Sequence, residues 1–441
     1  MNAEISIKSK FFVDAAWNYG AFGVMAATGV ILNFFIAAYF GIEALGVFNQ
    51  IYAVYVISAQ FAVMGFHDSA QKYISEHGMG PENIGVVSAA ALALVSLFGL
   101  LTALCIYLLS GPIGVLVESE MVGKGIALAA PGVMFFAINK VLMGILNGVQ
   151  RMKAYAGVQT LRVSVILISC LGIAWLGFPA YMFGLSFAIA EIVLLPTLLV
   201  LVGPHPTYFS STEAFKRWIR LHFHFGSRAV INSLLAQTYI RVDVIMLGIF
   251  VSDRDVGIYS FAALFIDGLY QIAIVFRTLA NPKLARLLKE GDKRATGRFC
   301  RRVALLSLGV FTAAAAVVLF IYPYLGSYFP DDLVALSFPV LMVLISGLLI
   351  YSMMIPMDYI VLQGGRPDRQ SVLMSFNVAV NAALNLALIP VFGLMGACIA
   401  TAISFAVAFI AINGATWKWL GFKGGVLLYG TPLVSTEEGS V

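Results

Sequence analysis

Charged residues are scarce in this sequence. Its 27 Lys and Arg and 22 Asp and Glu make up only 11% of the 441 residues, well below the share of about 25% in soluble globular proteins. No phosphate-binding loop of the form GxxxxGK[ST] occurs, which excludes an ATPase within the chain. Cysteine is also rare, and its spacing shows neither the pairs nor the nearby histidines of a metal or redox site. The four cysteines are Cys105, Cys170, Cys300 and Cys398.

Long apolar runs are present instead. Hydrophobic residues make up 61% of the chain, and its mean hydropathy is +0.93. Runs of about 20 residues, enough for a helix to cross the hydrocarbon core, recur along the whole length. The first run is too long for a signal-peptide core and no small-residue cleavage site follows it, so we expect it to be retained. The sequence therefore predicts an all-α, polytopic membrane protein with twelve spans. They lie at about 16–39, 46–66, 84–109, 124–149, 154–176, 179–202, 227–250, 256–277, 303–325, 334–362, 370–390 and 395–418.

The distribution of Lys and Arg predicts the orientation of the spans, because cytoplasmic segments carry an excess of positive charge. With the N-terminus inside, inner segments hold 22 of the 27 basic residues and outer segments hold two. The other three, Lys140, Arg162 and Arg241, lie within spans. All five tryptophans, Trp17 among them, fall near predicted membrane interfaces. We therefore expect both termini to be cytoplasmic.

The spans divide into two groups of six. Between the sixth and seventh spans lies a basic, aromatic and amphipathic stretch, which we expect to form a helix on the inner membrane surface. The two halves of the chain resemble each other weakly, as parallel repeats would. This predicts two six-helix lobes around a central cavity. The expected divisions are an N-terminal lobe at 1–203, a linker at 204–225, a C-terminal lobe at 226–423 and a cytoplasmic tail at 424–441.

Arg241 and Asp243 lie inside an apolar run, where each charge costs roughly 2.5–3.5 kcal/mol and usually faces protein or water. Residues two apart are separated by about 200° around a helix, so this pair cannot share a face. Asp267 is expected at a similar depth on the next, antiparallel helix, and an Arg241–Asp267 ion pair is geometrically plausible. Two interpretations stay open: a buried pair that fixes the second lobe, and a direct ligand or coupling role.

Lys140 and Arg162 are the corresponding cations of the first lobe. Lys140 lies near the midplane of the fourth span and has no partner nearby in sequence, which favours a water-filled cavity and an anionic ligand. The alternative is an ion pair with Glu191, at mid-depth on the sixth span. Arg162 lies deep enough on the fifth span either to reach the interface along its alkyl stem or to belong to the same cationic cavity. Glu191, Asp243 and Asp267 are therefore candidates for gating or ion pairing.

Three asparagines form a polar stripe along the eleventh predicted span. Asn377, Asn381 and Asn385 follow one another at a spacing of four residues and so share one helix face. Asparagine facing lipid would be costly, so the stripe is expected to face protein or a cavity. It is either a packing element between helices or a cavity wall that hydrogen-bonds sugar hydroxyls or other polar cargo.

Several motifs resemble a known family. They are RVDVIMLG at 241–248 followed by VGIYSFA at 256–262, LNGVQRMK at 146–153, LQGGRPDR at 362–369 and PVFGLMGA at 390–397. With these motifs the chain resembles the polysaccharide transporter branch of the multidrug/oligosaccharidyl-lipid/polysaccharide exporter superfamily, the O-antigen-type flippases. The resemblance covers essentially the whole chain.

The resemblance implies a flippase that passes a lipid-pyrophosphate-linked oligosaccharide, such as a polysaccharide or O-antigen repeat unit, from the inner to the outer leaflet by alternating access. Its setting would be the cytoplasmic membrane of a bacterium or an archaeon. Cationic residues in the cavity are then expected to meet the pyrophosphate, and Lys140, Arg162 and Arg241 are the candidates by depth and charge. Expected partners are the polyprenyl-linked cargo, membrane lipids, and the polymerases and glycosyltransferases of polysaccharide assembly. No nucleic acid, cofactor or metal is expected, and because no bond is made or broken the chain is not expected to be an enzyme.

The main alternative is an antiporter of the same superfamily that exports organic cations in exchange for Na⁺ or H⁺. Such an antiporter favours a buried acidic site in one lobe, whereas three basic residues within the spans favour an anionic cargo. A membrane glycosyltransferase, polymerase or ligase would normally need a large outer loop or a catalytic carboxylate motif, and the sequence has neither.

Overall fold

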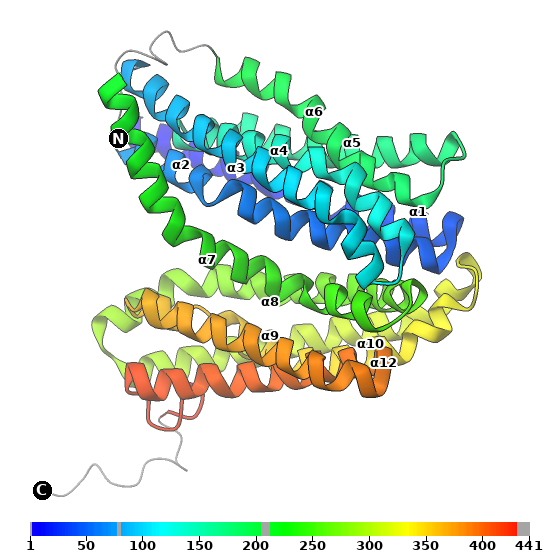
Figure 1. Cartoon of the computed structure of the whole chain (residues 1–441). Helices are drawn as coiled ribbons and strands as arrows, with labels where there is room; N and C mark the ends of the chain where they lie inside the picture. The colour runs from blue at the N-terminus through cyan, green and yellow to red at the C-terminus, as the bar shows by residue number, and fades with distance from the viewer. Residues whose placement is uncertain (1, 77–80, 204–211, 430–441) are drawn as a thin grey trace, which may run out of the picture. The chain divides into compact units, whose positions relative to one another are not determined.

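The computed structural model describes residues 2–76, 81–203 and 212–429, and these residues are almost entirely helical, with no strand among them (Figure 1). A helix satisfies the backbone N–H and C=O groups within one segment, which hydrocarbon demands of a spanning chain. The chain forms two compact units, Met1–Thr238 and Tyr239–Val441. Their boundary falls within one long helix, α7 (Thr212–Phe250), which contributes to both units.

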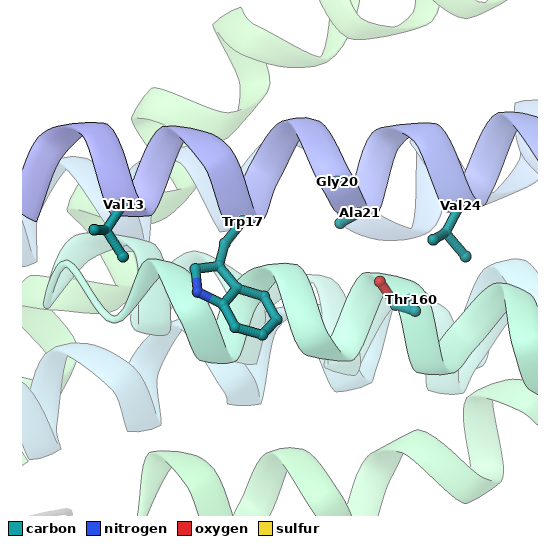
Figure 2. Close-up of a pocket in the computed structure, with 6 residues that line it drawn as sticks. All are labelled: Val13, Trp17, Gly20, Ala21, Val24 and Thr160. Carbon is teal, nitrogen blue, oxygen red and sulfur yellow. The ribbon is translucent and has the colours of Figure 1, made fainter.

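The first unit is built from α1 to α6 and the first part of α7. α1 changes direction at Gly41, where φ is 85°, a backbone conformation that glycine adopts readily and other residues do not. One long helix therefore contains two spans. α1 and α5 pack beside each other and leave a groove between them (Figure 2). The helices are α1 (Asn2–Val63), α2 (Phe66–Glu76), α3 (Pro81–Leu116), α4 (Glu120–Gly148), α5 (Met152–Trp175) and α6 (Phe183–Val202).

α4 is the packing centre of the first unit, in contact with α1, α2, α3 and α6. Glycines allow its close approach to two of these helices. A Cβ at Gly132 would lie 2.9 Å from the backbone of Ala188 on α6, and a Cβ at Gly144 would lie 2.5 Å from the His67 carbonyl oxygen on α2. Small residues permit such contacts between membrane helices. Lys140, one turn before Gly144, is thereby held beside α2.

The first part of α7 packs on α2 and α3. The His222 ring is fully buried; its Nε2 lies 3.1 Å from the Val87 carbonyl oxygen on α3 and its Nδ1 lies 2.7 Å from Ser69 Oγ on α2. Because a carbonyl only accepts, Nε2 carries the hydrogen and Nδ1 accepts from Ser69. Residues 212–225 of the predicted linker thus begin α7 and are continuous with the predicted seventh span. Residues 204–211 lie outside the described residues.

The second unit is built from the remainder of α7 and α8 to α12. α10 packs against both α8 and α12. α12 changes direction at Gly393, where φ is 56°, so it too contains two spans. The helices are α8 (Asp253–Glu290), α9 (Lys293–Ile321), α10 (Leu333–Ser352), α11 (Ile360–Gln363) and α12 (Pro367–Leu420), with 3₁₀ turns at Tyr322–Tyr328 and Ile355–Met357. Residues 430–441 of the predicted tail lie outside the described residues.

The described residues contain nine helices that are long and apolar enough to cross a membrane. Two of them, α1 and α12, are bent at a glycine and contain two spans each. α7 is not among these nine, but its last part coincides with the predicted seventh span. The helices therefore match the twelve predicted spans, and the prediction of an all-α, polytopic membrane protein is confirmed.

Candidate functional site

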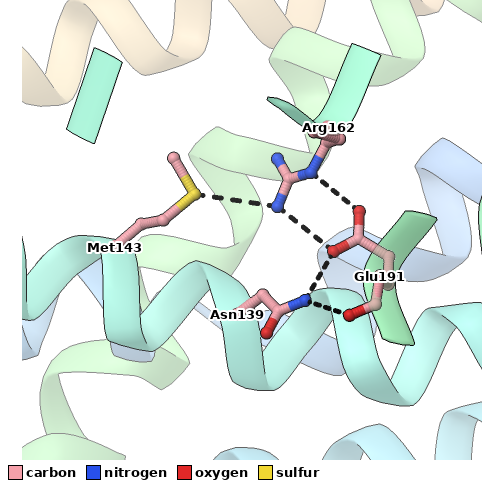
Figure 3. Close-up of polar contacts among 4 residues, drawn as sticks. All are labelled: Asn139, Met143, Arg162 and Glu191. Carbon is pink, nitrogen blue, oxygen red and sulfur yellow. Dashed lines mark hydrogen bonds and ion pairs between the residues drawn. The ribbon is translucent and has the colours of Figure 1, made fainter. Parts of the chain in front are cut away.

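A buried polar cluster joins α4, α5 and α6 in the first unit (Figure 3). Arg162 Nε lies 2.8 Å from Glu191 Oε1, and Arg162 Nη2 donates to Glu191 Oε2 at 3.3 Å. The Asn139 amide donates to the same Oε2 and to the Glu191 carbonyl oxygen, each at 2.8 Å. Glu191 is 1% exposed and Asn139 is fully buried. The buried carboxylate thus has both a cation and a neutral donor, as a buried charge requires.

Arg162 is held on its other sides by apolar groups. Its guanidinium lies 4.9 Å from the centre of the Phe136 ring, and Nη2 lies 3.7 Å from Met143 Sδ. A cation over an aromatic face is attracted by the ring quadrupole. The charge of Arg162 is therefore compensated within the first unit, and the structure pairs Glu191 with Arg162, not with Lys140.

Lys140 is the cation of this cluster that has no such partner. It forms no hydrogen bond or ion pair with any residue that the structure describes, although the charges of Arg162, Asp68 and Glu191 act on it at longer range. Asp68 is on α2, outside the spans. Partial burial raises the pKa of its carboxyl, and the Lys140 charge opposes that rise. Lys140 therefore presents an uncompensated ammonium group next to a partly exposed carboxylate.

His67 does not supply a competing positive charge. Its Nε2 lies 3.2 Å from Asp68 Oδ1. Burial, and to a smaller extent the Lys140 charge, lower the pKa of His67 to about 3. The ring is consequently neutral near neutral pH, so its contact with Asp68 is not an ion pair. An anionic ligand that reaches Lys140 would compete with the charges of Asp68 and Glu191, and Glu191 is already paired with Arg162.

The second unit buries a carboxylate without a cation. Asp243 on α7 is 8% exposed and forms no ion pair with any described residue. Tyr259 on α8 and Thr401 on α12 each donate to its Oδ2 at 2.9 Å. Asn385 on α12 donates to its Oδ1 at 2.6 Å and to Asn381 Oδ1 at 3.0 Å. Of the predicted asparagine stripe, Asn385 therefore binds Asp243 directly, and Asn381 is linked to it through Asn385.

This arrangement can hold a proton or a small cation. Asn385 Oδ1 is buried and has no hydrogen-bond partner, so it offers a free oxygen next to the carboxylate. Carboxylate, amide and hydroxyl oxygens suit hard cations. No group of three or more His, Cys, Asp and Glu that could hold a metal occurs among the described residues. With a single carboxylate, the Asp243 site fits a monovalent charge better than a divalent one.

The other candidates lie apart from these two clusters. Arg241 is partly exposed and interacts electrostatically with Asp267 on α8, which is exposed on the surface of the second unit. Asn377, one turn before Asn381, is half-buried, and its Oδ1 has no hydrogen-bond partner in the described structure. Asp243 and Arg241 have different surroundings, as their separation around the helix predicts.

Sequence reasoning did not identify several members of these clusters. Asn139, Tyr259 and Thr401 bind the two buried carboxylates, yet single Asn, Tyr and Thr residues are too common in apolar helices to stand out. A further ion pair joins Arg277 on α8 to Asp358, at 2.8 Å with both side chains largely buried. The position of Asp358 near the inner end of a span gave no indication of this partner.

Two protein-family models match parts of the chain. Residues 14–288 match a family model described as polysaccharide biosynthesis protein, and residues 229–387 match the MatE family model. No curated protein matches the chain.

Solved structures share the fold. A structure of lipid II flippase MurJ in an inward closed conformation has a TM-score of 0.71 and 15% identity, over 91% of this chain and 86% of that chain. An inward-facing multidrug resistance MATE family transporter of the MOP superfamily has a TM-score of 0.71 and 15% identity, over 87% and 92%. A MOP superfamily transporter from Pyrococcus furiosus has a TM-score of 0.55 and 16% identity, over 88% and 92%. At these identities the likeness establishes the fold alone.

Proposed function

The chain belongs to the polysaccharide biosynthesis protein family, and from this premise we propose that it is a flippase for a lipid-pyrophosphate-linked oligosaccharide. The cargo would pass from the inner to the outer leaflet by alternating access of two lobes. A sugar and a diphosphate cannot cross hydrocarbon unaided, because their polar groups would lose their hydration without compensation. The transporter would shelter the head group while the polyprenyl chain stays in lipid. No bond is made or broken, so the proposed function is not enzymatic.

The observation that carries this proposal is the uncompensated ammonium group of Lys140. A cation inside a membrane protein is costly and normally faces a partner, water or a ligand. Arg162 is already paired with Glu191, whereas Lys140 forms no ion pair with a described residue. We therefore propose Lys140 as the primary contact of the pyrophosphate. Arg162, which stays paired with Glu191, would add positive charge near the pyrophosphate. Arg241 and Asn377 are proposed as further cargo contacts.

The Asp243 site supports ion coupling rather than the binding of an organic cation. Its carboxylate is 8% exposed and already accepts from Tyr259, Thr401 and Asn385, which leaves room for a proton or a small cation but not for a drug. Asp243, Asn381 and Asn385 are therefore proposed to couple transport to Na⁺ or H⁺. The antiporter alternative would need a more open acidic site.

The proposed setting is the cytoplasmic membrane of a bacterium or an archaeon, with both termini in the cytoplasm. The excess of Lys and Arg in the segments between spans on one side supports this orientation. We propose the divisions at 1–203, 204–225, 226–423 and 424–441 as the functional parts. Glycosyltransferases that build the cargo and polymerases that consume it are the proposed protein partners.

Substitution of Lys140 tests the function. In proteoliposomes that contain a fluorescent lipid-pyrophosphate-linked oligosaccharide, Lys140→Gln and Lys140→Ala should slow transfer between leaflets by at least about tenfold, equivalent to roughly 1.4 kcal/mol. Lys140→Arg, which keeps the charge, should retain most of the rate. Lys124→Gln is the matched control, because Lys124 is exposed and pairs with Glu120. Wild-type rates in both Lys140→Gln and Lys140→Ala would remove Lys140 from the mechanism.

A further inference from the structure

An apolar groove runs along α1 where it faces α5. It has a volume of about 460 Å³ and is lined by Val13, Trp17, Gly20, Ala21, Val24 and Thr160. Figure 2 shows the side chains of Trp17 and Ala21 directed from α1 toward α5, with Thr160 directed toward α1. The α1 residues recur at three- and four-residue intervals and therefore share one face of the helix.

The groove is mostly apolar: the polar side-chain groups that line it are the indole N–H of Trp17 and the hydroxyl of Thr160. Its one side-chain hydroxyl, that of Thr160, donates to the Ala156 carbonyl oxygen at 3.2 Å and is thereby satisfied. Large apolar side chains that line the groove are exposed: Trp17 is 53% exposed and Val24 is 41% exposed. Space is left by Gly20, because a Cβ placed there would meet no atom within 4 Å. An apolar chain fits such a surface, and a sugar or a phosphate does not.

We propose that this groove holds the first isoprene units of the polyprenyl chain of the cargo. The proposal rests on the proposed flippase function, which supplies an amphiphile whose tail stays in lipid while its head group enters the protein. It also rests on the proposed orientation, which places this end of α1 in the inner leaflet, where the cargo is loaded.

The length of the groove fits one leaflet. From Val13 to Val24 a helix rises about 16 Å, roughly half of the 30 Å hydrocarbon core. Trp17 lies at the predicted inner interface, so Val24 is about 10 Å deeper. A chain that enters at the interface and lies along α1 would therefore stay within the inner leaflet.

The groove and the candidate head-group site share helix α5. Thr160 and Arg162 are two residues apart on α5, on different faces of the same helix. Arg162 in turn pairs with Glu191 on α6 (Figure 3), and its charge acts at longer range on Lys140 of α4. α5 thus presents the groove on one face and the polar cluster on another, which suits a ligand with an apolar tail and an anionic head.

The test uses Trp17 as a reporter. The full chain is reconstituted with brominated phospholipids, and the Trp17 signal is taken as the difference between the wild-type protein and Trp17→Phe. Polyprenol and polyprenyl pyrophosphate should both relieve the bromolipid quenching in a saturable manner, and inorganic pyrophosphate should not. Gly20→Leu should raise the half-saturating concentration by at least about fivefold, roughly 1 kcal/mol. Gly29→Leu is the matched control on α1, since Gly29 also has open space around it and lies outside the groove.

Three results would overturn the proposal: no saturable relief by polyprenol, an unchanged response in Gly20→Leu, or equal relief by a linear long-chain alcohol, which would indicate an ordinary lipid-facing surface. Because polyprenol lacks the pyrophosphate, its effect is independent of Lys140. If transfer between leaflets occurs and Trp17 does not respond, the groove does not bind the polyprenyl chain and the proposed function stands. If Trp17 responds and no transfer occurs, the groove is an isoprenoid site and the proposed function is wrong.

Discussion

Glu191→Gln tests the buried polar cluster of the first unit most directly. The substitution keeps the shape of the side chain and removes the charge that faces Arg162, which is only 12% exposed. At 2.8 Å and an effective dielectric constant of about 20, the lost attraction is about 6 kcal/mol. Breaking one side of a buried pair typically costs about 3–5 kcal/mol. We therefore expect Glu191→Gln to lower the free energy of unfolding by about 3–5 kcal/mol.

The measurement is unfolding of the purified protein by SDS in mixed micelles. The double variant Arg162→Gln/Glu191→Gln removes both charges and should recover much of the lost stability, because no unpaired charge is left inside the unit. Lys124→Gln breaks an exposed ion pair with Glu120 and should leave the unfolding midpoint in place. Wild-type stability in Glu191→Gln, or a double variant no more stable than the single one, would refute the ion pair as a determinant of this cluster.

Two further predictions concern α7. Asp243→Asn keeps an oxygen acceptor for Tyr259 and Thr401, so the variant should fold normally. It should abolish the dependence of cargo transfer on a Na⁺ or H⁺ gradient. An unchanged dependence in proteoliposomes would contradict ion coupling at this residue. Burial lowers the pKa of His222, on the part of α7 before the seventh span, to about 4, compared with about 6.5 in an unfolded chain. The unfolded state then binds more protons between these values, so stability should fall as pH drops through this window, by up to about 1.4 kcal/mol per pH unit. His222→Gln should remove part of this loss in thermal unfolding scans at pH 7.5 and 5, and His224→Gln, an exposed control on the same helix, should not.

Hydropathy predicted the spans because the membrane imposes a strong and uniform requirement on every segment that crosses it. It could not show that the predicted linker and the seventh span form one continuous helix. Hydropathy detects the change from an interfacial to a buried environment, and within α7 this change occurs without a break in the backbone. The bends in α1 and α12, by contrast, fall at glycines in short outer segments that were expected between spans.

Depth along a span identified which charges lie inside the first unit but not which of them pair. By depth, Lys140 was the one basic residue that we named as a possible partner of Glu191, whereas Arg162 was expected to reach the interface or to belong to a cationic cavity. In the structure, Glu191 pairs with Arg162, because the rotation of α5 directs the guanidinium toward α6. From α4, Asn139 and not Lys140 contacts the Glu191 carboxylate. Helix rotation depends on packing between elements, and a single sequence does not contain it. The same limit hid Tyr259 as a donor to Asp243.

Two buried polar residues, His222 and Asp243, anchor α7 to its neighbouring helices. His222 binds α2 and α3 of the first unit, and Asp243 binds α8 and α12 of the second. They are 21 residues apart in the sequence of α7. A ligand changes a conformational equilibrium only through its different affinity for the two states. Under the proposed ion coupling, a cation or proton at Asp243 would compete with the bonds from Tyr259, Thr401 and Asn385 that fix α7 in the second unit. Its binding would then change the stability of this anchor and leave the one at His222 intact. In the proposed cycle, this difference is how an ion at Asp243 can act on cargo bound near Lys140 without contacting it.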